Sequence, residues 1–203
     1  MKKYSVIVFD LGKVLIPFDY SPVTEKFNKL KPNLGDKFKD LYAKNYHIHQ
    51  QFERGDLSQD EFISIMLEWL EGTITAEKFC RIFSDIFTIN QNVVELLPVL
   101  KQSYTLVLLS NTNEMHKKYG YGHMEFLQQF HKLVLSHEVR AIKPEEKIYR
   151  AVEAFTQKPS SEHFFIDDIL EYVEEAKKCG WGGTQFVGYE KLVEALKAEG
   201  ILE

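Results

Sequence analysis

The sequence predicts an α/β fold, a doubly wound parallel sheet with an all-helical domain inserted after the first strand. From about residue 89 onward, short apolar runs alternate with helical segments, an order typical of parallel sheets. The first apolar run, residues 6–9, is mostly β-branched and is typical of a strand buried on both faces. Residues 17–88 carry only helical patterns. We therefore expect residues 1–16 and 89–203 to form the core and residues 17–88 to form a separate helical domain.

Several helix-start signals lie in the inserted segment. Ser21 as N-cap and Pro22 at the first helical position predict a helix soon after the first strand. Residues 58–61 have the S-x-x-E form of a capping box, and the apolar residues behind them fall on one helical face. Gly72 closes that predicted helix and Thr75 opens the next. The insert is therefore expected to be a compact group of helices.

The remaining elements follow from alternating apolar runs and helix boundaries. We expect further strands at 104–109, 133–135, 163–166 and 185–187. We expect helices at 92–102, 144–156, up to 178, and 189–199. Pro98 should kink the helix in which it lies, because it lacks the backbone N–H of other residues. Helical segments up to residue 130 should be loosely joined around Gly120 and Gly122.

Composition and charge exclude several classes of protein. The 203 residues are 44% hydrophobic and 27% charged, as in ordinary soluble globular proteins. A net charge of −5 without a long basic stretch argues against nucleic acid as a ligand. No segment approaches the ~20 apolar residues of a membrane span, and Asp10 interrupts the apolar run that a signal peptide needs. Two isolated cysteines suit a reducing compartment. We expect a cytoplasmic protein without nucleic-acid or membrane partners, as a monomer or a homodimer.

Reactive or charged side chains follow the predicted strands. Asp10 follows the first strand, and the pair Ser110-Asn111 follows the second. The pair Asp167-Asp168 follows the fourth, and Lys143 stands at the head of a helix. The carboxyl ends of parallel strands meet at one edge of a sheet, where α/β proteins bind ligands. Asp10 by itself could equally well cap the turn at Gly12, but the combination of strand ends favours a functional site.

The chemistry of these residue types points to phosphoryl transfer. Three carboxylates in one crevice repel one another, and their pKa values rise unless a cation lies among them. Oxygen ligands of this kind select Mg²⁺, which also binds substrate phosphates. The Lys143 ammonium would offset charge on a transferring phosphoryl group, and the amides at Ser110-Asn111, near a helix start, would bind phosphate. The consistent reaction is attack of Asp10 on phosphorus, which gives an aspartyl-phosphate that water hydrolyses.

Four short segments carry these residues, and together they resemble a known family. They are Phe9-Asp10-Leu11-Gly12, Leu109-Ser110-Asn111, Lys143-Pro144 and Phe165-Ile166-Asp167-Asp168. In order and spacing they resemble the four motifs of the haloacid dehalogenase (HAD) superfamily, over essentially the whole chain. The resemblance implies a Rossmann-like core and a small helical (C1-type) cap domain formed by the insert. Phe52-Glu53-Arg54-Gly55 and Leu109-Ser110-Asn111-Thr112-Asn113 further resemble the α-D-glucose-1-phosphate phosphatase-like branch.

The resemblance implies a role for each residue of the metal site. Asp10 would be both nucleophile and metal ligand. Gly12 would supply a backbone carbonyl and Asp168 a carboxylate to Mg²⁺. Asp167 would contact Lys143 or a metal-bound water rather than the metal itself.

The resemblance also implies the substrate contacts. Ser110 and the Asn111 amide would hold phosphoryl oxygens, and Lys143 would brace the nucleophile and the phosphate. Polar residues of the insert are expected to face the crevice, where each would either contact the substrate or lie solvated on its helix. They are His47, His49, Glu53 and Arg54.

Two positions depart from the family pattern. Most family phosphatases have a second aspartate two residues after the nucleophile, as general acid and base, where this chain has Gly12. Loss of general acid–base catalysis costs on the order of 10²- to 10⁴-fold in rate. Asp19 could replace the missing acid, or instead take a turn role beside Ser21. The second departure is Tyr172, where the family commonly has asparagine.

Three functions remain open at the level of sequence. The first is a Mg²⁺-dependent phosphatase for a small phosphorylated metabolite, in particular a sugar phosphate. The second is a metal-free 2-haloacid dehalogenase in which Asp10 attacks carbon, and the pair Asp167-Asp168 argues against it. The third is a weakly catalytic or non-catalytic phosphometabolite-binding protein, favoured only by Gly12.

Overall fold

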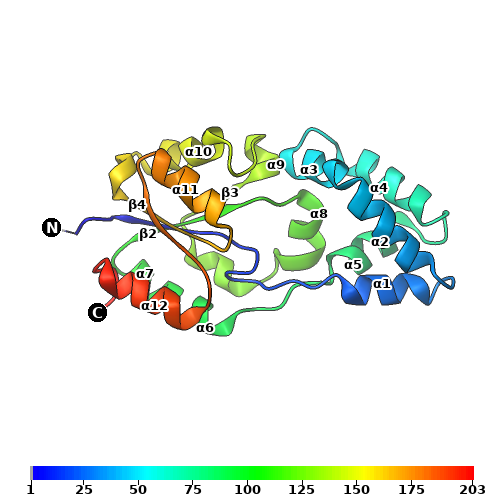
Figure 1. Cartoon of the computed structure of the whole chain (residues 1–203), viewed down its shortest axis with the longest axis horizontal. Coiled ribbons are helices and arrows are strands. Elements are labelled where there is room, and N and C mark those ends of the chain that lie inside the picture. Colours follow the sequence, from blue (N-terminus) through cyan, green and yellow to red (C-terminus); the bar gives the residue numbers. More distant parts are fainter. Residues whose placement is uncertain (1) are drawn as a thin grey trace.

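Strand β1, Val6–Phe9, is the central strand of a five-stranded parallel sheet in the computed structural model, which describes residues 2–203 (Figure 1). The strand order is β3-β2-β1-β4-β5, and every pair is parallel. The other strands are β2 (Thr105–Ser110), β3 (Lys132–Leu135), β4 (His163–Asp167) and β5 (Gly182–Gln185). The predicted α/β class with a doubly wound parallel sheet is confirmed.

Alternate residues of β1 pack into two different apolar layers. Val6 and Val8 belong to one buried cluster, and Ile7 and Phe9 belong to the other. This follows from the two-residue period of a strand, which places successive side chains on opposite faces. In Figure 1, α10 (Glu146–Thr156) and α11 (Leu170–Lys178) lie above the sheet, and α6 (Gln91–Val94), α7 (Leu96–Lys101) and α12 (Tyr189–Ala198) lie below it. Burial on both faces explains why β1 is apolar throughout.

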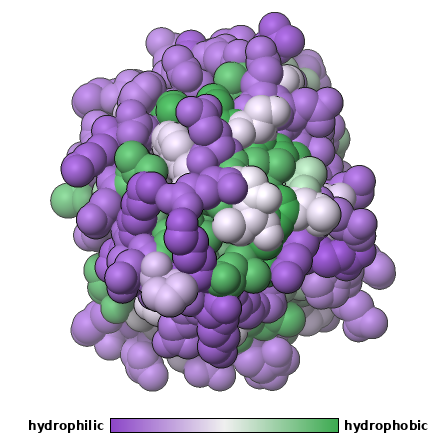
Figure 2. Space-filling model, turned by 90° about the vertical axis from the view of Figure 1, so that its right-hand side faces the viewer, coloured by the Kyte–Doolittle hydropathy of each residue, from purple (hydrophilic) through white to green (hydrophobic). Residues whose placement is uncertain are grey.

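Five helices form a separate group at one end of the molecule (Figure 1). They are α1 (Ser21–Asn28), α2 (Leu34–Lys44), α3 (Tyr46–Arg54), α4 (Gln59–Trp69) and α5 (Ala76–Ser84), and we call them the helical insert. Their apolar faces bury a core of their own that is rich in phenylalanine and includes Phe62 and Phe83. Met115, from α8 (Glu114–His116), also packs into it. The outer end of the insert is largely hydrophilic, with apolar side chains visible between polar ones (Figure 2).

The two segments that connect the insert to the sheet run side by side. We call residues 15–19 and 86–90 the paired connection, because their backbones are hydrogen bonded to each other. The bonds include Asn90 N to Leu15 O at 2.8 Å, Thr88 N to Pro17 O at 2.9 Å and Asp19 N to Ile86 O at 3.0 Å. The chain therefore enters and leaves the insert at one place.

Short irregular elements follow β2. They are α8 (Glu114–His116), a π-helix η1 (Lys117–Tyr121) and a 3₁₀-helix η2 (Glu125–Gln129). The helix α9 (Ser136–Val139) follows β3, and a 3₁₀-helix η3 (Ser160–Glu162) precedes β4. No helix within residues 2–203 is long and apolar enough to cross a membrane.

Most helix boundaries agree with the sequence, and the capping box is formed. Ser58 Oγ accepts from Glu61 N at 3.3 Å, and the Glu61 carboxylate accepts from Ser58 N at 2.9 Å. Thr75 caps α5 as predicted. Ser21, however, is the first residue of α1 and not its N-cap, which is Tyr20. Asp19 accepts from Ser21 N at 2.8 Å, which is the turn role considered for it.

One helix and one strand of the core differ from the elements predicted from the sequence. The predicted helix around Pro98 is divided into α6 and α7 at Glu95, because Pro98 has no N–H to offer the carbonyl of Val94. The last strand was predicted at 185–187 but lies at Gly182–Gln185. A Cβ at Gly182 would lie 2.3 Å from the Tyr4 hydroxyl, so the strand can lie this close to Tyr4 because position 182 has no side chain.

Candidate active site

The predicted site residues converge at the carboxyl edge of the sheet. Asp10 directly follows β1, and its backbone N–H continues the ladder to β4 by donating to Ile166 O at 2.9 Å. Ser110 ends β2 and Asp167 ends β4, the two strands that flank β1. Asp10 is only 6% exposed and Asp167 is fully buried. The crevice lies where the chain winds away from β1 in two directions, the usual ligand position in such sheets.

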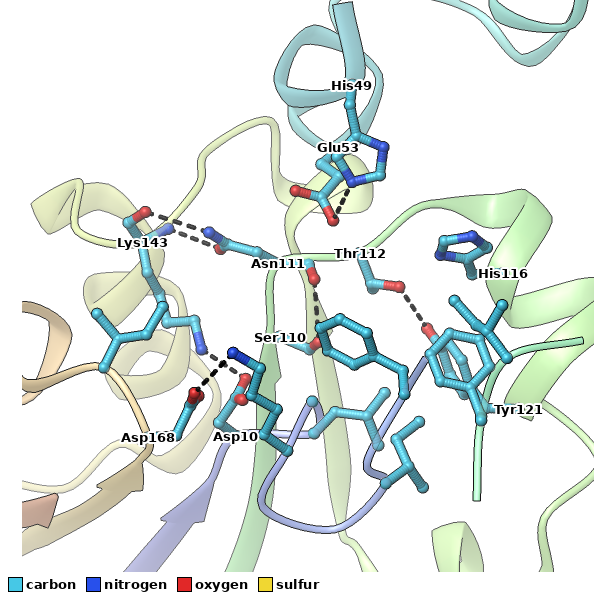
Figure 3. Close-up of a pocket in the computed structure, with 18 of the residues that line it drawn as sticks. Asp10, His49, Glu53, Ser110, Asn111, Thr112, His116, Tyr121, Lys143 and Asp168 are labelled. Atoms are coloured by element: carbon cyan, nitrogen blue, oxygen red, sulfur yellow. Dashed lines mark hydrogen bonds and ion pairs between the residues drawn. The ribbon is translucent and has the colours of Figure 1, made fainter. Parts of the chain in front are cut away.

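Lys143 joins two of the carboxylates. Its Nζ lies 2.5 Å from Asp10 Oδ1 and 2.6 Å from Asp167 Oδ2, and the residue is 2% exposed. Asn111 holds the Lys143 backbone, accepting from its N–H at 2.7 Å and donating to its carbonyl at 3.2 Å (Figure 3). The loop after β2 therefore fixes the position of the lysine that contacts the end of β1.

Burial dominates the electrostatics of the site. It raises the pKa of Asp10 to about 7, against an opposing effect of Lys143 and a further rise from Asp167. Burial and the nearby Asp167 also raise the pKa of Asp168. Burial would lower the pKa of Lys143, but the Asp10 and Asp167 carboxylates outweigh it and keep that pKa above its usual value. Lys143 is therefore a charged ammonium beside Asp10, whose carboxyl group ionises with difficulty.

Oxygen atoms of Asp10, Asp167 and Asp168 lie within 4.8 Å of one another, a spacing suited to one cation. The three residues are not equivalent. Both oxygens of Asp167 already accept hydrogen bonds, one from Lys143 and one from Ile169 N at 2.8 Å. One carboxylate oxygen of Asp10 accepts from Lys143, and the other takes no part in that hydrogen bond. The donor set fits Mg²⁺, with Asp10 and Asp168 as the carboxylates able to reach it.

Gly12 adjoins this group of oxygens. Its carbonyl accepts from Val14 N at 2.7 Å and retains a second lone pair. A Cβ at this position would lie 3.9 Å from Asp10 Oδ2 and 3.2 Å from the Phe18 ring. Phe18 therefore occupies part of the space that a side chain at position 12 would need. The Lys13 side chain is exposed to solvent, and its Nζ lies 3.6 Å from Asp168 Oδ2.

A cavity of about 210 Å³ separates the sheet edge from the helical insert. Asp10, Lys143 and Asp168 lie on the sheet side, and His49 and Glu53 lie opposite them on α3 (Figure 3). His49 Nε2 lies 3.0 Å from Glu53 Oε1. On the other side of the imidazole, Nδ1 lies 2.6 Å from the Tyr42 hydroxyl. The insert thus contributes a connected polar group to a wall that is otherwise mainly aromatic.

Two residues expected at the crevice lie elsewhere. His47 is exposed and does not border the cavity. Residues two positions apart point to nearly opposite sides of a helix, so His49 faces inward where His47 faces outward. Arg54 also lies outside the cavity wall, where it pairs with Glu145 and with Asp56 at 3.2 Å. Of the predicted polar residues of the insert, His49 and Glu53 are those that border the cavity.

Several cavity residues were not found from the sequence. They are Tyr20, Tyr42, Tyr46, Phe87, Thr112, His116 and Tyr121. Tyr46, His49 and Glu53 share a helix face at spacings of three and four residues, a signal that could have been used. Tyr121 is brought in by the π-helix, which no sequence pattern indicated. Burial lowers the pKa of His116 to about 3, so this imidazole is neutral.

No family model matches the chain. Among solved structures, a HAD family enzyme from Bacteroides thetaiotaomicron is 27% identical with a TM-score of 0.78, over 91% of this chain and 94% of that one. The same enzyme in complex with magnesium and inorganic phosphate is 27% identical with a TM-score of 0.77, over 90% and 93% of the two chains. The chain is a HAD-superfamily hydrolase.

More distant structures share the fold of this HAD hydrolase. A predicted HAD-like hydrolase from Porphyromonas gingivalis has a TM-score of 0.81 at 22% identity, over 99% of this chain and 100% of that chain. An L-2-haloacid dehalogenase from Xanthobacter autotrophicus, with chloropropionic acid covalently bound, has a TM-score of 0.63 at 18% identity. The match covers 100% of this chain and 85% of the dehalogenase chain. These two likenesses concern the fold alone.

Tyr172, the second departure from the family pattern, lies close to Lys143 in this HAD hydrolase. Tyr172, on α11, borders the cavity, and the Lys143 ammonium lies 5.2 Å from the centre of its ring. The Phe165 ring lies 5.5 Å from the same ammonium. An aromatic ring attracts a cation through its π-electrons. Tyr172 and Phe165 thus help to hold Lys143 beside Asp10.

Proposed function

We propose that this HAD hydrolase is a Mg²⁺-dependent phosphatase for a small phosphorylated metabolite, with a sugar phosphate as the favoured class. The observation that carries the proposal is the set of contacts around the Asp10 carboxylate. One oxygen of this carboxylate is held by a buried ammonium, and the other is open toward a cavity with two more carboxylates. Support also comes from the magnesium and phosphate complex of the Bacteroides enzyme. A buried carboxylate beside a cation site suits attack on phosphorus.

In the proposed reaction, Asp10 and Asp168 would hold Mg²⁺ together with the Gly12 carbonyl. The ion would neutralise negative charge that builds up around the phosphoryl group. An Asp10 oxygen attacks phosphorus, the bond from phosphorus to the leaving oxygen breaks, and water then hydrolyses the aspartyl-phosphate. Ser110 and the Asn111 amide hold phosphoryl oxygens, and Lys143 orients Asp10.

We also propose that residues 17–88 form a cap that closes over the core formed by residues 1–16 and 89–203. Closure would exclude water and strengthen the charge interactions inside the cavity.

The two thiols, Cys80 and Cys179, are buried and free, which suits a reducing compartment. We accordingly assign the activity to the cytoplasm.

The first test is phosphate release from a panel of sugar phosphates, measured with Mg²⁺ and with EDTA. We expect turnover that requires Mg²⁺ and favours a few sugars. The Asp10→Asn variant should lose at least about 10³-fold in kcat while it keeps its fold, because it lacks the nucleophile. Asp10→Asn with near-normal turnover would rule out the assigned nucleophile. Chloride release from 2-chloropropionate by the wild-type chain, without metal, would instead identify a dehalogenase.

A further inference from the structure

The cavity lacks a carboxylate at position 12, where a proton donor for the leaving group would be expected. Hydrolysis of an alkyl phosphate leaves an alkoxide that needs a proton, and general acids supply it at a gain of on the order of 10²- to 10⁴-fold. The side chain of Phe18 lies where a group at position 12 would project. The proton donor must therefore come from another part of the cavity wall.

We propose that Glu53 is the general acid that protonates the leaving oxygen. The proposal rests on the proposed phosphatase function. In-line displacement places the leaving oxygen on the side of phosphorus away from the attacking oxygen. Asp10 attacks from the sheet side of the cavity, so the leaving oxygen faces the insert, where Glu53 lies (Figure 3). Glu53 is therefore on the correct side of the cavity.

The other titratable groups that border the cavity, among the described residues, are poorly suited to this role. Asp10 and Asp168 belong to the proposed metal site, with Lys13 beside Asp168, while Lys143 and Asp167 are bonded to each other. Both ring nitrogens of His49 have partners, and His116 is neutral. The tyrosines face Glu53 from several elements, and burial raises their pKa values, to about 12 for Tyr46. They are Tyr20, Tyr42, Tyr46, Tyr121 and Tyr172.

Two polar contacts place the Glu53 carboxyl group beside His49 and Tyr42. Its Oε1 lies 3.0 Å from His49 Nε2, and His49 Nδ1 is hydrogen bonded to the Tyr42 hydroxyl at 2.6 Å. Burial keeps the pKa of Tyr42 well above its usual value, so this hydroxyl retains its proton. The contact with His49 is at Oε1, which leaves Oε2 to carry the proton in the proposed reaction. The Glu53 side chain is 15% exposed, so it is partly sheltered from bulk water.

The backbone at Glu53 is attached to the core. Ser136 Oγ lies 2.6 Å from the Glu53 carbonyl and accepts from Thr112 N at 2.9 Å, which links Glu53 to the loop that follows Ser110. The next residue, Arg54, pairs with Glu145, two positions after Lys143. In this conformation of the insert, the backbone of Glu53 is therefore held close to the residues that would bind the phosphate.

Every bond and proton is accounted for in the two proposed steps. As the bond from Asp10 to phosphorus forms, the leaving oxygen takes the electron pair of its bond to phosphorus and the proton of Glu53, and departs as an alcohol. Water then attacks the aspartyl-phosphate and gives one proton to the Glu53 carboxylate. The bond from Asp10 to phosphorus breaks, which releases phosphate and restores both carboxyl groups to their starting states.

The test compares two leaving groups of similar shape in single-turnover experiments with Mg²⁺. p-Nitrophenyl phosphate releases a stable phenolate that needs no proton, whereas benzyl phosphate releases an alkoxide that does. We expect Glu53→Gln to slow benzyl alcohol release on the order of 10²-fold and p-nitrophenolate release by less than about threefold. Glu138→Gln is the matched control, since Glu138 is half-exposed and lies outside the cavity wall. It should leave both rates unchanged.

Preserved p-nitrophenolate release also reports that the variant is folded. Equal loss on both substrates would overturn the proposal, because it indicates a structural role. A rise in KM with unchanged single-turnover rates would also overturn it, because it indicates substrate binding only. A wild-type chain that hydrolyses neither phosphate would overturn the proposed function itself. Activity in the wild-type chain with equal loss in Glu53→Gln overturns this inference alone.

Discussion

At the scale of single residues, Lys143 decides whether the buried carboxylates can coexist. It contacts Asp10 and Asp167 at once, and the three side chains are almost fully buried. Burying ionised groups is costly, so an ion pair of this kind contributes little to stability even when it is complete. Its main effect is that neither carboxylate is left without a cation. The structure therefore depends strongly on a residue that is also proposed to act in the reaction.

Lys143→Met should destabilise the fold by about 3–5 kcal/mol at pH 8, because it leaves two buried carboxylates without their cation. Urea unfolding followed by circular dichroism measures this change. Lys13→Met is the matched control, since this lysine is exposed and lies 3.6 Å from Asp168. It should cost less than about 1 kcal/mol, as exposed pairs do. Equal losses in the two variants would contradict the role given to Lys143.

The raised pKa of Asp10 predicts how pH and Mg²⁺ interact. Its pKa is about 7 in the folded chain against an ordinary 3.8, so the folded state binds this proton more tightly than the unfolded state. Without metal, the contribution of Asp10 to stability therefore falls as pH rises from about 4 to about 7. Mg²⁺ competes with the same proton. Its affinity should be on the order of tenfold higher at pH 8 than at pH 6, because most Asp10 is ionised only at the higher pH.

Thermal unfolding with and without Mg²⁺ at the two pH values checks this prediction. The increase in Tm that Mg²⁺ produces should be larger at pH 8. Ca²⁺ provides a comparison, because it also needs the ionised carboxylates but accepts less regular geometry. An equal increase at pH 6 and pH 8 would mean that Asp10 is not a ligand or that its pKa is not raised.

At the scale of elements, the end of α3 is one part of the insert that contacts the core. Gly55 ends this helix with φ of +79°, and a Cβ there would lie 2.7 Å from the His137 carbonyl oxygen. The close approach of α3 to α9 therefore needs both the backbone freedom and the small size of glycine. This contact lies two residues from Glu53, which borders the cavity.

Gly55→Ala should cost about 1–2 kcal/mol from the left-handed backbone alone, and more from the contact with His137. Gly72→Ala is the matched control, because Gly72 has φ of +65° but nothing within 4 Å of a Cβ. We expect Gly55→Ala to lose more stability than Gly72→Ala and to lower kcat/KM as well. Chemical unfolding and steady-state kinetics measure the two effects. Equal stability loss would show that the close contact is unimportant.

Local signals were sufficient for most elements and insufficient for others. The capping box at Ser58 and the apolar strand ending at Asp10 depend on neighbours in the sequence, and both were predicted. Strand β5 depends on distant residues, since Tyr4 fills the space that a side chain at Gly182 would need where this residue pairs with β4. Choosing His49 over His47 required the rotation of α3, which the sequence did not determine.

At the scale of the whole molecule, residues outside the insert carry all three carboxylates and Lys143, and the insert carries Glu53 and His49. The four motifs predicted that the strand ends meet, and the structure brings them together. The strand order could not be derived from the sequence, because it depends on pairing between segments far apart in the chain. The aromatic wall of the cavity was also missed, because it forms only when the insert packs over the sheet.

Replacing residues 17–88 with a short Gly-Ser linker should leave a folded core that still binds Mg²⁺. The ends to be joined lie close together, since Asn90 N donates to Leu15 O at 2.8 Å. Circular dichroism and the Mg²⁺-induced rise in Tm check the prediction. Selectivity among sugar phosphates should be lost, because the wall of the cavity formed by the insert is removed. A chain that does not fold would show that residues 17–88 are not a separate domain.

The paired connection has a consequence for how this protein can change over evolutionary time. Because the chain leaves and re-enters the sheet at one place, insertions, deletions and substitutions in the insert need not alter how the strands pair. Apart from Glu53, the residues that would carry the chemistry lie outside that segment. Substrate preference can thus diversify in one part of the gene while the reaction is preserved in the other.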